Sequence, residues 1–575
     1  MTTRHPTSDD AASVFSSLRG YRGAWLRGDV IAGLTVWAVL VPEALAYATI
    51  AGVSPVVGLY AAPPALVLYA LIGSSRHLVV GPMSATAALS AAAVAQFATQ
   101  GSDSFVTLTA ALAIVTGLTA LIAGLLRLGF LANFISEPVL KGFIVGLALT
   151  IIMGQVPKLF GVEKGGGEFF SQLWHFITHL GDTSGLTILV GAISLAVVLA
   201  LRRIAPVVPA SLVAVALGVA LVKLFDLDQH GVDIVGHIDS GLPSVGIPDV
   251  GSARYADLIA PAFGVALVGF AEGLGAAKTY AARMHYEVDT NRELMGLGAA
   301  NVGAGLASGM VVNGSLSKTA VNGSAGARSQ LSGLVCAALT VVTLLLLTGL
   351  FEDLPEATLA AVVIAAVLEL VDIPALERLY RVRSPAPRGI YGVVGRPDFL
   401  AAIAALIGVL AFGTLPGLFI GIAISLLLLV YRASRPHVAV LGEVPGAAGQ
   451  WTDVALHSDN KQVDGVVVAR VESGLYFFNA DHIRTVITQL AGADGTHAVV
   501  LDAASVPSID VSAAQMLATL RDELARRHVR LLVVRAVGQV REVLEETGVA
   551  DELGTRHVFP SIAAAVQDAA AAPNR

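Results

Sequence analysis

The chain has 575 residues, of which 55% are hydrophobic and only 14% are charged, and its mean hydropathy is +0.74. A soluble protein carries about 25% charged residues, so this composition excludes an ordinary soluble globule, and the single cysteine, Cys336, excludes a disulfide-stapled secreted scaffold. A formal net charge of −7 offers no basic surface for nucleic acid, so we expect a polytopic membrane protein with a soluble appendage and no nucleic-acid partner.

Long apolar runs predict about fourteen membrane-spanning segments, because a span needs about 20 mostly apolar residues. They are expected at 30–50, 56–73, 82–99, 105–126, 138–157, 185–202, 207–225, 258–280, 294–309, 312–326, 330–350, 356–371, 398–413 and 415–431. The segment 312–326 is apolar only in part. A cleaved signal peptide is the alternative for the first run, but that run is too long and further spans follow it.

The charges between these segments predict their orientation in the bilayer. Basic residues fall in the even-numbered loops, whereas the odd-numbered loops carry mostly acids. The basic set is Arg76, Arg127, Arg202, Arg203, Arg283, Arg292, Arg328, Arg378, Arg381, Arg383, Arg388 and Arg396, with Arg19, Arg22, Arg27, Arg432 and Arg435 at the two ends. This positive-inside pattern places both termini in the cytoplasm of a bacterial-type inner membrane.

The composition becomes that of a soluble domain after Arg435. Buried strands are predicted at 463–471, 497–503 and 529–535, and helices at 511–527 and 537–547, the last of which ends before Gly548. This alternation indicates a small α/β domain. We therefore expect a cytoplasmic N-terminal segment at 1–27, a transmembrane transport domain at 28–434 and a cytoplasmic α/β domain at 435–575.

Two acidic residues lie inside predicted spans, where polar groups are costly and point to function. Glu43 follows Pro42, a helix-kinking residue, which suggests the wall of a cavity. The alternative is that Glu43 lies near the end of the span and reaches water. Glu272 lies in the middle of its span, so it is either protonated or paired with Lys278, Lys318 or a bound cation. A purely structural ion pair is the alternative for Glu272.

Two interrupted segments, 79–89 and 310–330, occupy the third place in each set of seven spans. Each contains the pattern S-x-T-A, as Ser84 to Ala87 and as Ser317 to Ala320. Glu43 and Glu272 also lie in corresponding spans, the first and the eighth. Because seven is odd, two such halves must cross the membrane in opposite directions, so the sequence predicts an inverted repeat with broken helices.

A broken helix begins with unpaired N–H groups and about half a positive charge, so two such starts near the midplane form an anion site. Hydroxyl groups of Ser84, Thr86, Ser317 and Thr319 would add donors, and Lys318 would add a full charge. The alternative is that small and hydroxyl residues only allow close helix packing. The segment NGSLSKT lacks the glycine that a phosphate loop needs before its lysine, and no strand is expected before it. No cofactor is expected, and the thirteen histidines show no metal-binding spacing.

At these motifs the sequence resembles the sulfate permease (SulP) family of anion transporters, which are related to pendrin and prestin. The resemblance rests on VPEALAYATIAGVSPVVGLY, GSSRHLVVGPMSATAAL, RLGFLANFISEPVLKGFIVGLA and EVDTNRELMGLGAAN with GSLSKTAVNGSAGARSQLSG, and it extends from about residue 25 to residue 570. It implies fourteen α-helical spans in two inverted seven-span repeats, arranged as core and gate, a C-terminal STAS domain and a homodimer.

The family motifs also imply the residues around the transported anion. These are Glu43, Tyr47, Met83, Ser84, Ala85, Thr86, Ser315, Leu316, Ser317, Lys318 and Thr319. Glu272 matches the acid of proton- or sodium-coupled members, so we expect Glu272, with Glu43, to bind the coupling ion. Val511 stands where STAS phosphoswitches have serine, so a scaffolding or dimer-packing role is expected for this domain, with an unidentified cytoplasmic partner.

The function expected from these observations is secondary active transport of a small anion, not enzymatic catalysis. Sulfate leads among the substrates on family frequency alone, and bicarbonate or a dicarboxylate such as fumarate comes next. Two other classes stay open at this point. One is an uncoupled anion exchanger or channel, and the other is a membrane-anchored STAS regulator.

Overall fold

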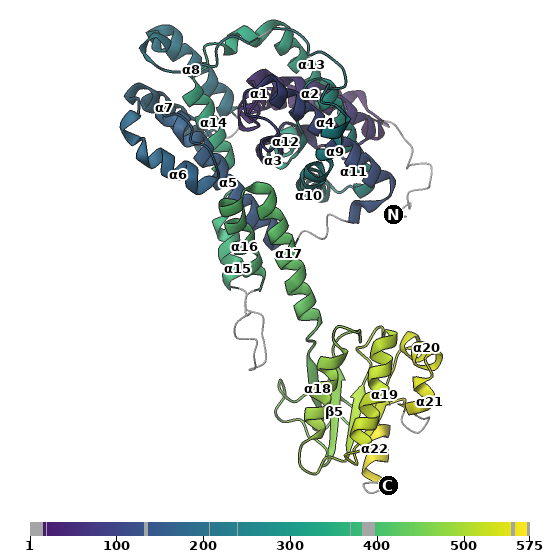
Figure 1. The fold of residues 1–575 in the computed structure, drawn as a ribbon. Coiled ribbons are helices and arrows are strands. Elements are labelled where there is room, and N and C mark those ends of the chain that lie inside the picture. Colours follow the sequence, from purple (N-terminus) through teal and green to yellow (C-terminus); the bar gives the residue numbers. More distant parts are fainter. Residues whose placement is uncertain are drawn as a thin grey trace. The chain divides into compact units, whose positions relative to one another are not determined.

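The computed structural model describes residues 15–571 apart from 19, 131–135, 206–207, 239, 369, 382–396 and 554–557. Arg19, Arg383, Arg388 and Arg396, which enter the charge pattern, lie outside the described residues. The chain forms two compact units, Met1–Ser425 and Leu426–Arg575 (Figure 1).

Seven predicted spans of the first half each contain a helix. They are α1 (Leu26–Ile50), α2 (Pro55–Ile72), α3 (Ser84–Val94), α4 (Asp103–Leu125), α5 (Glu137–Phe160), α7 (Gly185–Ile204) and α8 (Ala210–Phe225). A short helix that was not predicted, α6 (Phe169–Thr178), exposes Phe170, Trp174 and Ile177. Pro42 lies inside α1, which continues as one helix on both sides of it.

The second half repeats the same order of helices. They are α10 (Ile259–Met284), α11 (Thr290–Leu306), α12 (Leu316–Ser324), α13 (Leu331–Val342), α14 (Glu356–Leu368), α16 (Pro397–Phe412) and α17 (Thr414–Ala433), with the short α9 (Ser252–Asp257) and α15 (Ile373–Arg381) between spans. A π-turn at Thr343–Leu347 and a 3-10 turn at Thr348–Phe351 extend α13. Among the described residues, nine helices are long and apolar enough to cross a membrane by length and composition.

Both interrupted segments begin with a short strand before their half-helix. Strand β1 (Val79–Gly81) precedes α3, and strand β2 (Asn313–Ser315) precedes α12. The two strands pair antiparallel, with Val79 opposite Ser315 and Gly81 opposite Asn313. The NGSLSKT segment itself opens with β2, and the described residues just before it form no strand, as expected; β2 was not predicted, because three residues are too few to show an alternating pattern.

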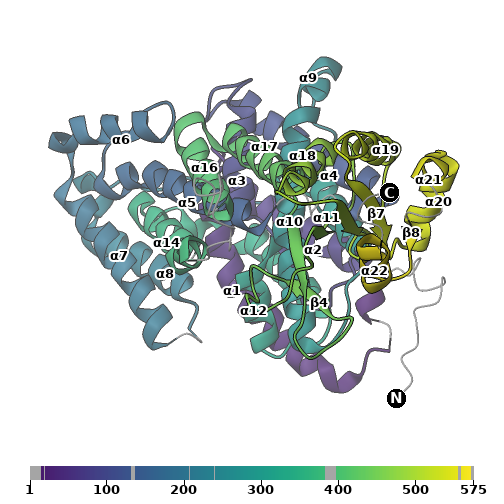
Figure 2. The same ribbon diagram turned by 90° about the horizontal axis from the view of Figure 1, so that it is seen from below.

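The helices of the first unit pack as two groups (Figures 1 and 2). Helices α1 to α4 pack with α10 to α13 around the β1–β2 ribbon, whereas α5 to α8 pack with α14 and α16. Helix α1 contacts both groups, because it also packs against α8 and α14. This division has the form of the expected core and gate.

Glycines allow the closest helix contact in the first group, between α4 and α11. A Cβ atom added at Gly298 would lie 2.8 Å from the backbone oxygen of Gly117, which is too short for any real contact. Only glycine fits there, because the two helix backbones nearly touch.

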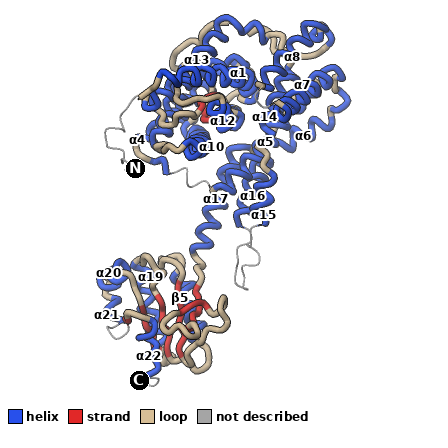
Figure 3. The backbone as a smooth tube through the Cα atoms, turned by 180° about the vertical axis from the view of Figure 1, so that it is seen from behind, coloured by secondary structure: helices blue, strands red, loops and turns tan. Residues whose placement is uncertain are grey.

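The second unit is an α/β domain around one six-stranded sheet of order β4-β3-β5-β6-β7-β8 (Figure 3). The strands are β3 (Val438–Glu443), β4 (Trp451–Asp453), β5 (Val466–Val471), β6 (Ala498–Asp502), β7 (Arg530–Val534) and β8 (Val558–Phe559). The helices are α18 (Ala480–Ala491), α19 (Val511–Ala525), α20 (Gly538–Glu546), α21 (Val549–Leu553) and α22 (Ile562–Ala571). Strand β3 runs antiparallel to β4 and β5, whereas β5 to β8 are parallel. The three predicted strands and two predicted helices are confirmed.

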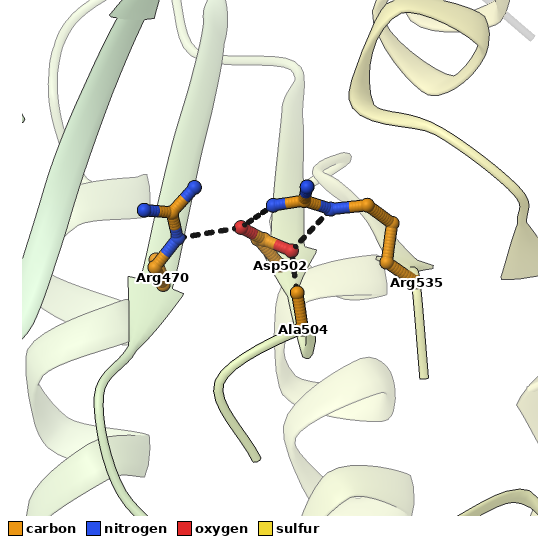
Figure 4. A network of polar contacts seen from close by, with 4 residues as sticks. All are labelled: Arg470, Asp502, Ala504 and Arg535. Carbon is orange, nitrogen blue, oxygen red and sulfur yellow. Dashed lines mark hydrogen bonds and ion pairs between the residues drawn. The ribbon is translucent and has the colours of Figure 1, made fainter. Parts of the chain in front are cut away.

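A charged cluster joins the carboxyl ends of the three central strands (Figure 4). Arg470 on β5 and Arg535 after β7 both donate hydrogen bonds to Asp502 on β6, whose side chain is fully buried. Burial raises the pKa of Asp502, but the hydrogen bonds from Arg535 and Arg470 outweigh it and hold the pKa below its usual value. Asp502 therefore stabilises the domain as a carboxylate.

Asp502→Asn is expected to lower the free energy of unfolding of this domain by about 2–3 kcal/mol at neutral pH, because two guanidinium groups lose their anion. A carboxyl with a lowered pKa contributes stability above its unfolded-state pKa and loses that contribution as the pH falls through its folded-state pKa. The difference from the wild type should therefore shrink below about pH 4. Calorimetry of the purified chain would measure it, with the exposed Asp494→Asn as control. An equal loss at pH 7 and at acid pH would contradict this account.

Candidate functional site

The two half-helices begin on either side of the β1–β2 ribbon. Because the strands are antiparallel, α3 begins beyond the Gly81 end of the ribbon and α12 begins beyond its Ser315 end, so both half-helices start at this one short ribbon. Among the described residues, no side chain caps the first turn of α3 after Met83, whereas the Ser315 Oγ caps α12 by accepting from the Lys318 N–H at 3.3 Å. The first N–H groups of α3 therefore have no side-chain acceptor in the part of the chain that the structure describes, as at any uncapped helix start.

A buried ion pair joins α1 to α12 at this place. The Lys318 Nζ donates to the Glu43 Oε2 at 2.6 Å, and the side chains are 2% and 6% exposed. The same Nζ lies 5.0 Å from the centre of the Tyr47 ring. Removing one member of such a pair is strongly destabilising, because a buried charge is left without compensation.

This ion pair corrects two expectations about the site. Lys318 was expected to present its charge directly to the anion, but Glu43 neutralises that charge in this structure. Glu43 was also considered as a residue that reaches water at the end of its span, but it is only 4% exposed. The sequence placed both groups at the site but not in contact with each other.

The other predicted residues surround the same ribbon, and some of their hydroxyl groups are already used. The Thr319 Oγ1 accepts from the Val79 N–H at 3.1 Å and so ties α12 to β1. The Thr86 Oγ1 donates to the Met83 carbonyl at 3.3 Å. Ser84 and Ala85 are buried, Met83 is half-buried, and Leu316 and Ser317 are exposed, with the Ser317 Oγ 3.3 Å from the Ser315 Oγ.

Glu272 on α10 contacts the ribbon through Asn313. The Asn313 Nδ2 donates to the Glu272 Oε2 at 3.5 Å. The proposed pairing of Glu272 with Lys318 is wrong, since that lysine contacts Glu43. Lys278, the other lysine considered, is exposed and makes no ion pair with Glu272 among the described side chains. Sequence reasoning missed Asn313, although the Asn-Gly step in front of α12 could have indicated it.

Sequence reasoning also missed a buried carboxylate that braces the segment before β1. Glu293 on α11 is fully buried and accepts hydrogen bonds from the Tyr69 hydroxyl at 2.7 Å and the Ser74 hydroxyl at 2.6 Å. It also accepts from the backbone N–H groups of Ser74 and Ser75. Glu293 therefore fixes the segment that leads into β1. Sequence reasoning missed it because the residues just before it, 290–292, are polar and look like part of a loop.

Glu293→Ala is expected to destabilise the first unit by about 3–5 kcal/mol, because four donors, among them buried ones, lose their acceptor. Uptake should fall with it, since the segment that leads into β1 loses its support. Thermal unfolding of the purified protein would measure the loss. Glu287→Ala is the matched control, because Glu287 lies in the same region and is exposed. Equal melting temperatures for the two variants would show that Glu293 does not brace the ribbon.

Comparisons with known proteins point to one family for both parts of the chain. A family model described as the sulfate permease family matches residues 26–385, and one described as the STAS domain matches residues 457–565. The chain is 39% identical over 553 residues to a protein named as a probable sulfate transporter from Mycobacterium tuberculosis (strain CDC 1551 / Oshkosh), covering 96% of each chain. It is 30% identical over 566 residues to the high affinity sulfate transporter 2 of Stylosanthes hamata, covering 94% of this chain and 83% of that one.

Two solved structures have the same fold. The structure of the murine Slc26a9 anion transporter in the inward-facing state matches with a TM-score of 0.85 at 23% identity, covering 97% of this chain and 93% of that one. The transmembrane domain of a cyanobacterial bicarbonate transporter, BicA, matches with a TM-score of 0.59 at 23% identity, covering 67% of this chain and 97% of that domain. At these identities the two structures establish the fold alone. They confirm the predicted fold class.

Proposed function

Because the chain belongs to the sulfate permease family, as a multi-pass membrane transporter of anions and not an enzyme, we propose that it carries sulfate by proton-coupled symport. The relatives named as sulfate transporters support this substrate. We propose that the protein lies in a bacterial inner membrane as a homodimer, with both termini and the STAS domain in the cytoplasm. An unidentified cytoplasmic partner would bind the STAS domain.

The observation that supports the proposal is the pairing of the strands that lead into the two half-helices, together with the Glu43–Lys318 ion pair on α1 and α12. Helix amino ends and an ammonium group favour an anion, whereas a nearby carboxylate opposes it. With Glu43 ionised, the pair is close to neutral and attracts an anion only weakly. A proton on Glu43 would leave the charge of Lys318 unbalanced, and an anion could then supply the missing negative charge.

Glu272 offers the second place for a coupling ion. It lies one hydrogen bond from Asn313, which is part of the ribbon between the half-helices. A change in the charge of Glu272 would therefore change the hydrogen bond to Asn313, which lies in the strand that leads into α12. We propose that Glu272 takes up the coupling proton and that Glu43 sets the charge of the site. A sodium ion at Glu272 is the alternative coupling ion.

Bicarbonate and dicarboxylates such as fumarate remain the alternative substrates, since helix amino ends and an ammonium group suit any of these oxyanions. One of the solved structures with this fold is named as a bicarbonate transporter, so bicarbonate is one of the anions that the uptake experiment compares. An uncoupled exchanger or channel would not need the carboxyl of Glu272 beside the ribbon.

Uptake of radiolabelled sulfate, bicarbonate and fumarate into proteoliposomes tests the proposal. We expect sulfate to accumulate when the outside is made acidic, and to accumulate little when only a sodium gradient is imposed. Accumulation driven by sodium alone would replace the proton with sodium as the coupling ion. Flux that is unchanged after both gradients are removed would contradict symport, and transport of none of the three anions would contradict the substrate assignment.

A further inference from the structure

One end of the STAS domain lies next to the end of the last apolar helix. Strand β3 begins at Val438, a few residues after α17 ends at Ala433, and Val438 pairs with Val471 at the carboxyl end of β5. Strands β6 and β7 run parallel to β5, so their carboxyl ends lie at this same end of the sheet. The loops that follow these strands are therefore the part of the domain nearest to the end of α17.

The loop after β5 exposes two neighbouring aromatic side chains at this end. Phe477 is 72% exposed and Phe478 is 37% exposed, and their ring centres lie 5.4 Å apart. Exposing two adjacent phenyl groups to water is unfavourable, because burying them would lower the free energy. Such an exposed apolar pair indicates a surface that contacts another apolar phase or molecule.

The loop is held in this position and is not free to fold the rings inward. The fully buried Asn479 accepts from the Tyr476 N–H at 2.9 Å and donates to the Gly474 carbonyl at 2.9 Å. The Tyr476 hydroxyl lies 2.6 Å from the Ser508 Oγ, and the Phe477 N–H donates to Asp510 at 2.7 Å. The backbone under both rings is therefore fixed at several points, which keeps the aromatic side chains outward.

A hydrogen bond ties this loop to the end of α17 within the same compact unit. The Asn479 Nδ2 donates to the carbonyl of Ala433, the last residue of α17, at 3.4 Å. Burial lowers the pKa of His482 on the first turn of α18, and the positive charge of Arg435, just after α17, also helps to lower it. The aromatic loop therefore lies beside the carboxyl end of α17.

The end of α17 has the residue pattern of a helix that reaches a membrane–water boundary. Leu427, Leu429 and Val430 on its last turns are 68%, 62% and 56% exposed, as expected for side chains that face lipid. They are followed by Tyr431 and Arg435, whose guanidinium lies 5.0 Å from the tyrosine ring centre. Aromatic and basic residues are enriched at this depth, where one end of the side chain is apolar and the other is wet.

We propose that Phe477 and Phe478 insert into the interfacial layer of the bilayer next to α17 and so hold the STAS domain against the membrane surface. The exposed apolar side chains on the last turns of α17 lead to the carboxyl end that this loop contacts, which is why lipid is the proposed occupant and not a second copy of the chain. The insertion of the loop itself is hydrophobic, because the exposed Glu472 is the one charged residue within 472–479 and the loop carries no basic side chain.

Site-specific fluorescence on the full chain in liposomes tests this proposal. The background is Cys336→Ala, which removes the single, fully buried cysteine. Phe477→Cys then receives an apolar, environment-sensitive fluorophore. The matched control is Ala493→Cys, an exposed position in the loop before β6 and so at the opposite end of the sheet. Quenchers are a spin-labelled lipid with its nitroxide on the acyl chain and iodide in the water.

We expect the label at position 477 to be blue-shifted and quenched by the lipid nitroxide, at a depth of about 5–10 Å, while the label at 493 is quenched only by iodide. The result should be the same in zwitterionic and anionic liposomes and at high salt. Adding Phe478→Ser should lower the ratio of inserted to free loop about tenfold, since one apolar ring no longer enters the bilayer. Iodide quenching at 477 equal to that at 493 would overturn the proposal. Protection from both quenchers would overturn it too, because a protein surface would then cover the loop. Neither outcome depends on which anion is transported.

Discussion

Replacing Lys318 with methionine is expected to lower the free energy of unfolding by about 3–5 kcal/mol, because the buried Glu43 carboxylate loses its ion-pair partner. Uptake should be abolished in the same variant, since an anion at the half-helix starts would face a carboxylate with no ammonium beside it. Thermal unfolding of the purified protein and uptake into proteoliposomes would measure the two effects separately.

The double variant Glu43→Leu with Lys318→Met separates stability from function. It removes both charges, and a pair of hydrophobic residues of similar volume is often as stable as a buried ion pair. We therefore expect most of the stability to return while uptake stays absent. Lys278→Met is the matched control, because it removes an exposed lysine from α10 and should change neither quantity. Uptake by the double variant close to that of the wild type would show that Lys318 serves only to balance Glu43.

The pairing of Lys318 with Glu43 could not be predicted from spacing, because 275 residues separate them. Each was identified on its own, as a charged group in an apolar segment. Two opposite charges at membrane depth in one compact bundle are costly unless they meet. Both α1, with Glu43, and α10, with Glu272, pack against α12, so only the side-chain contact of Lys318 with Glu43 decides between the two acids.

Most of the fold could be predicted from the length of the apolar segments and from the spacing of apolar residues along the chain, which are strong signals in long segments. All fourteen predicted segments contain a helix because each needs only its own residues to show the pattern. Several of the missed elements are short, although α18, α22 and strand β3 of the second unit were missed as well. Strands β1 and β2 have three residues each, and α6 is amphipathic and not apolar throughout. In the second unit the central strands were found because they are buried on both faces, whereas the edge strand β4 has only three residues.

The expected anion site stays a prediction, but the structure shows what its residues contact. The starts of α3 and α12 were expected to meet, and the strands that precede them pair with each other. The hydroxyls of Thr86 and Thr319 were expected to face the anion, but both form hydrogen bonds within the ribbon and its helices. A threonine side chain satisfies its hydrogen bonds locally whenever a backbone group lies within reach, and sequence does not show which group that is.

Glu272→Gln is expected to abolish acid-stimulated accumulation of sulfate while leaving anion binding within about threefold of the wild type. Glutamine keeps the length of the side chain and an oxygen that can accept from Asn313, so the ribbon should stay in place. The amide cannot take up and release a proton, so an inward proton gradient can no longer drive the anion. The expected loss is of the coupling and not of the site.

Two measurements on the same proteoliposomes distinguish these roles. Counterflow, in which labelled and unlabelled sulfate exchange without a gradient, needs binding and movement but no net proton transfer, so it should persist in Glu272→Gln. Accumulation against a gradient should disappear. Glu287→Gln, an exposed acid outside the ribbon, should alter neither. If accumulation still responds to external acid in Glu272→Gln, then Glu272 is not the coupling group and the proton must be carried elsewhere, with Glu43 next in line. If counterflow is lost as well, Glu272 belongs to the anion site itself, because a residue needed only for coupling would leave exchange intact.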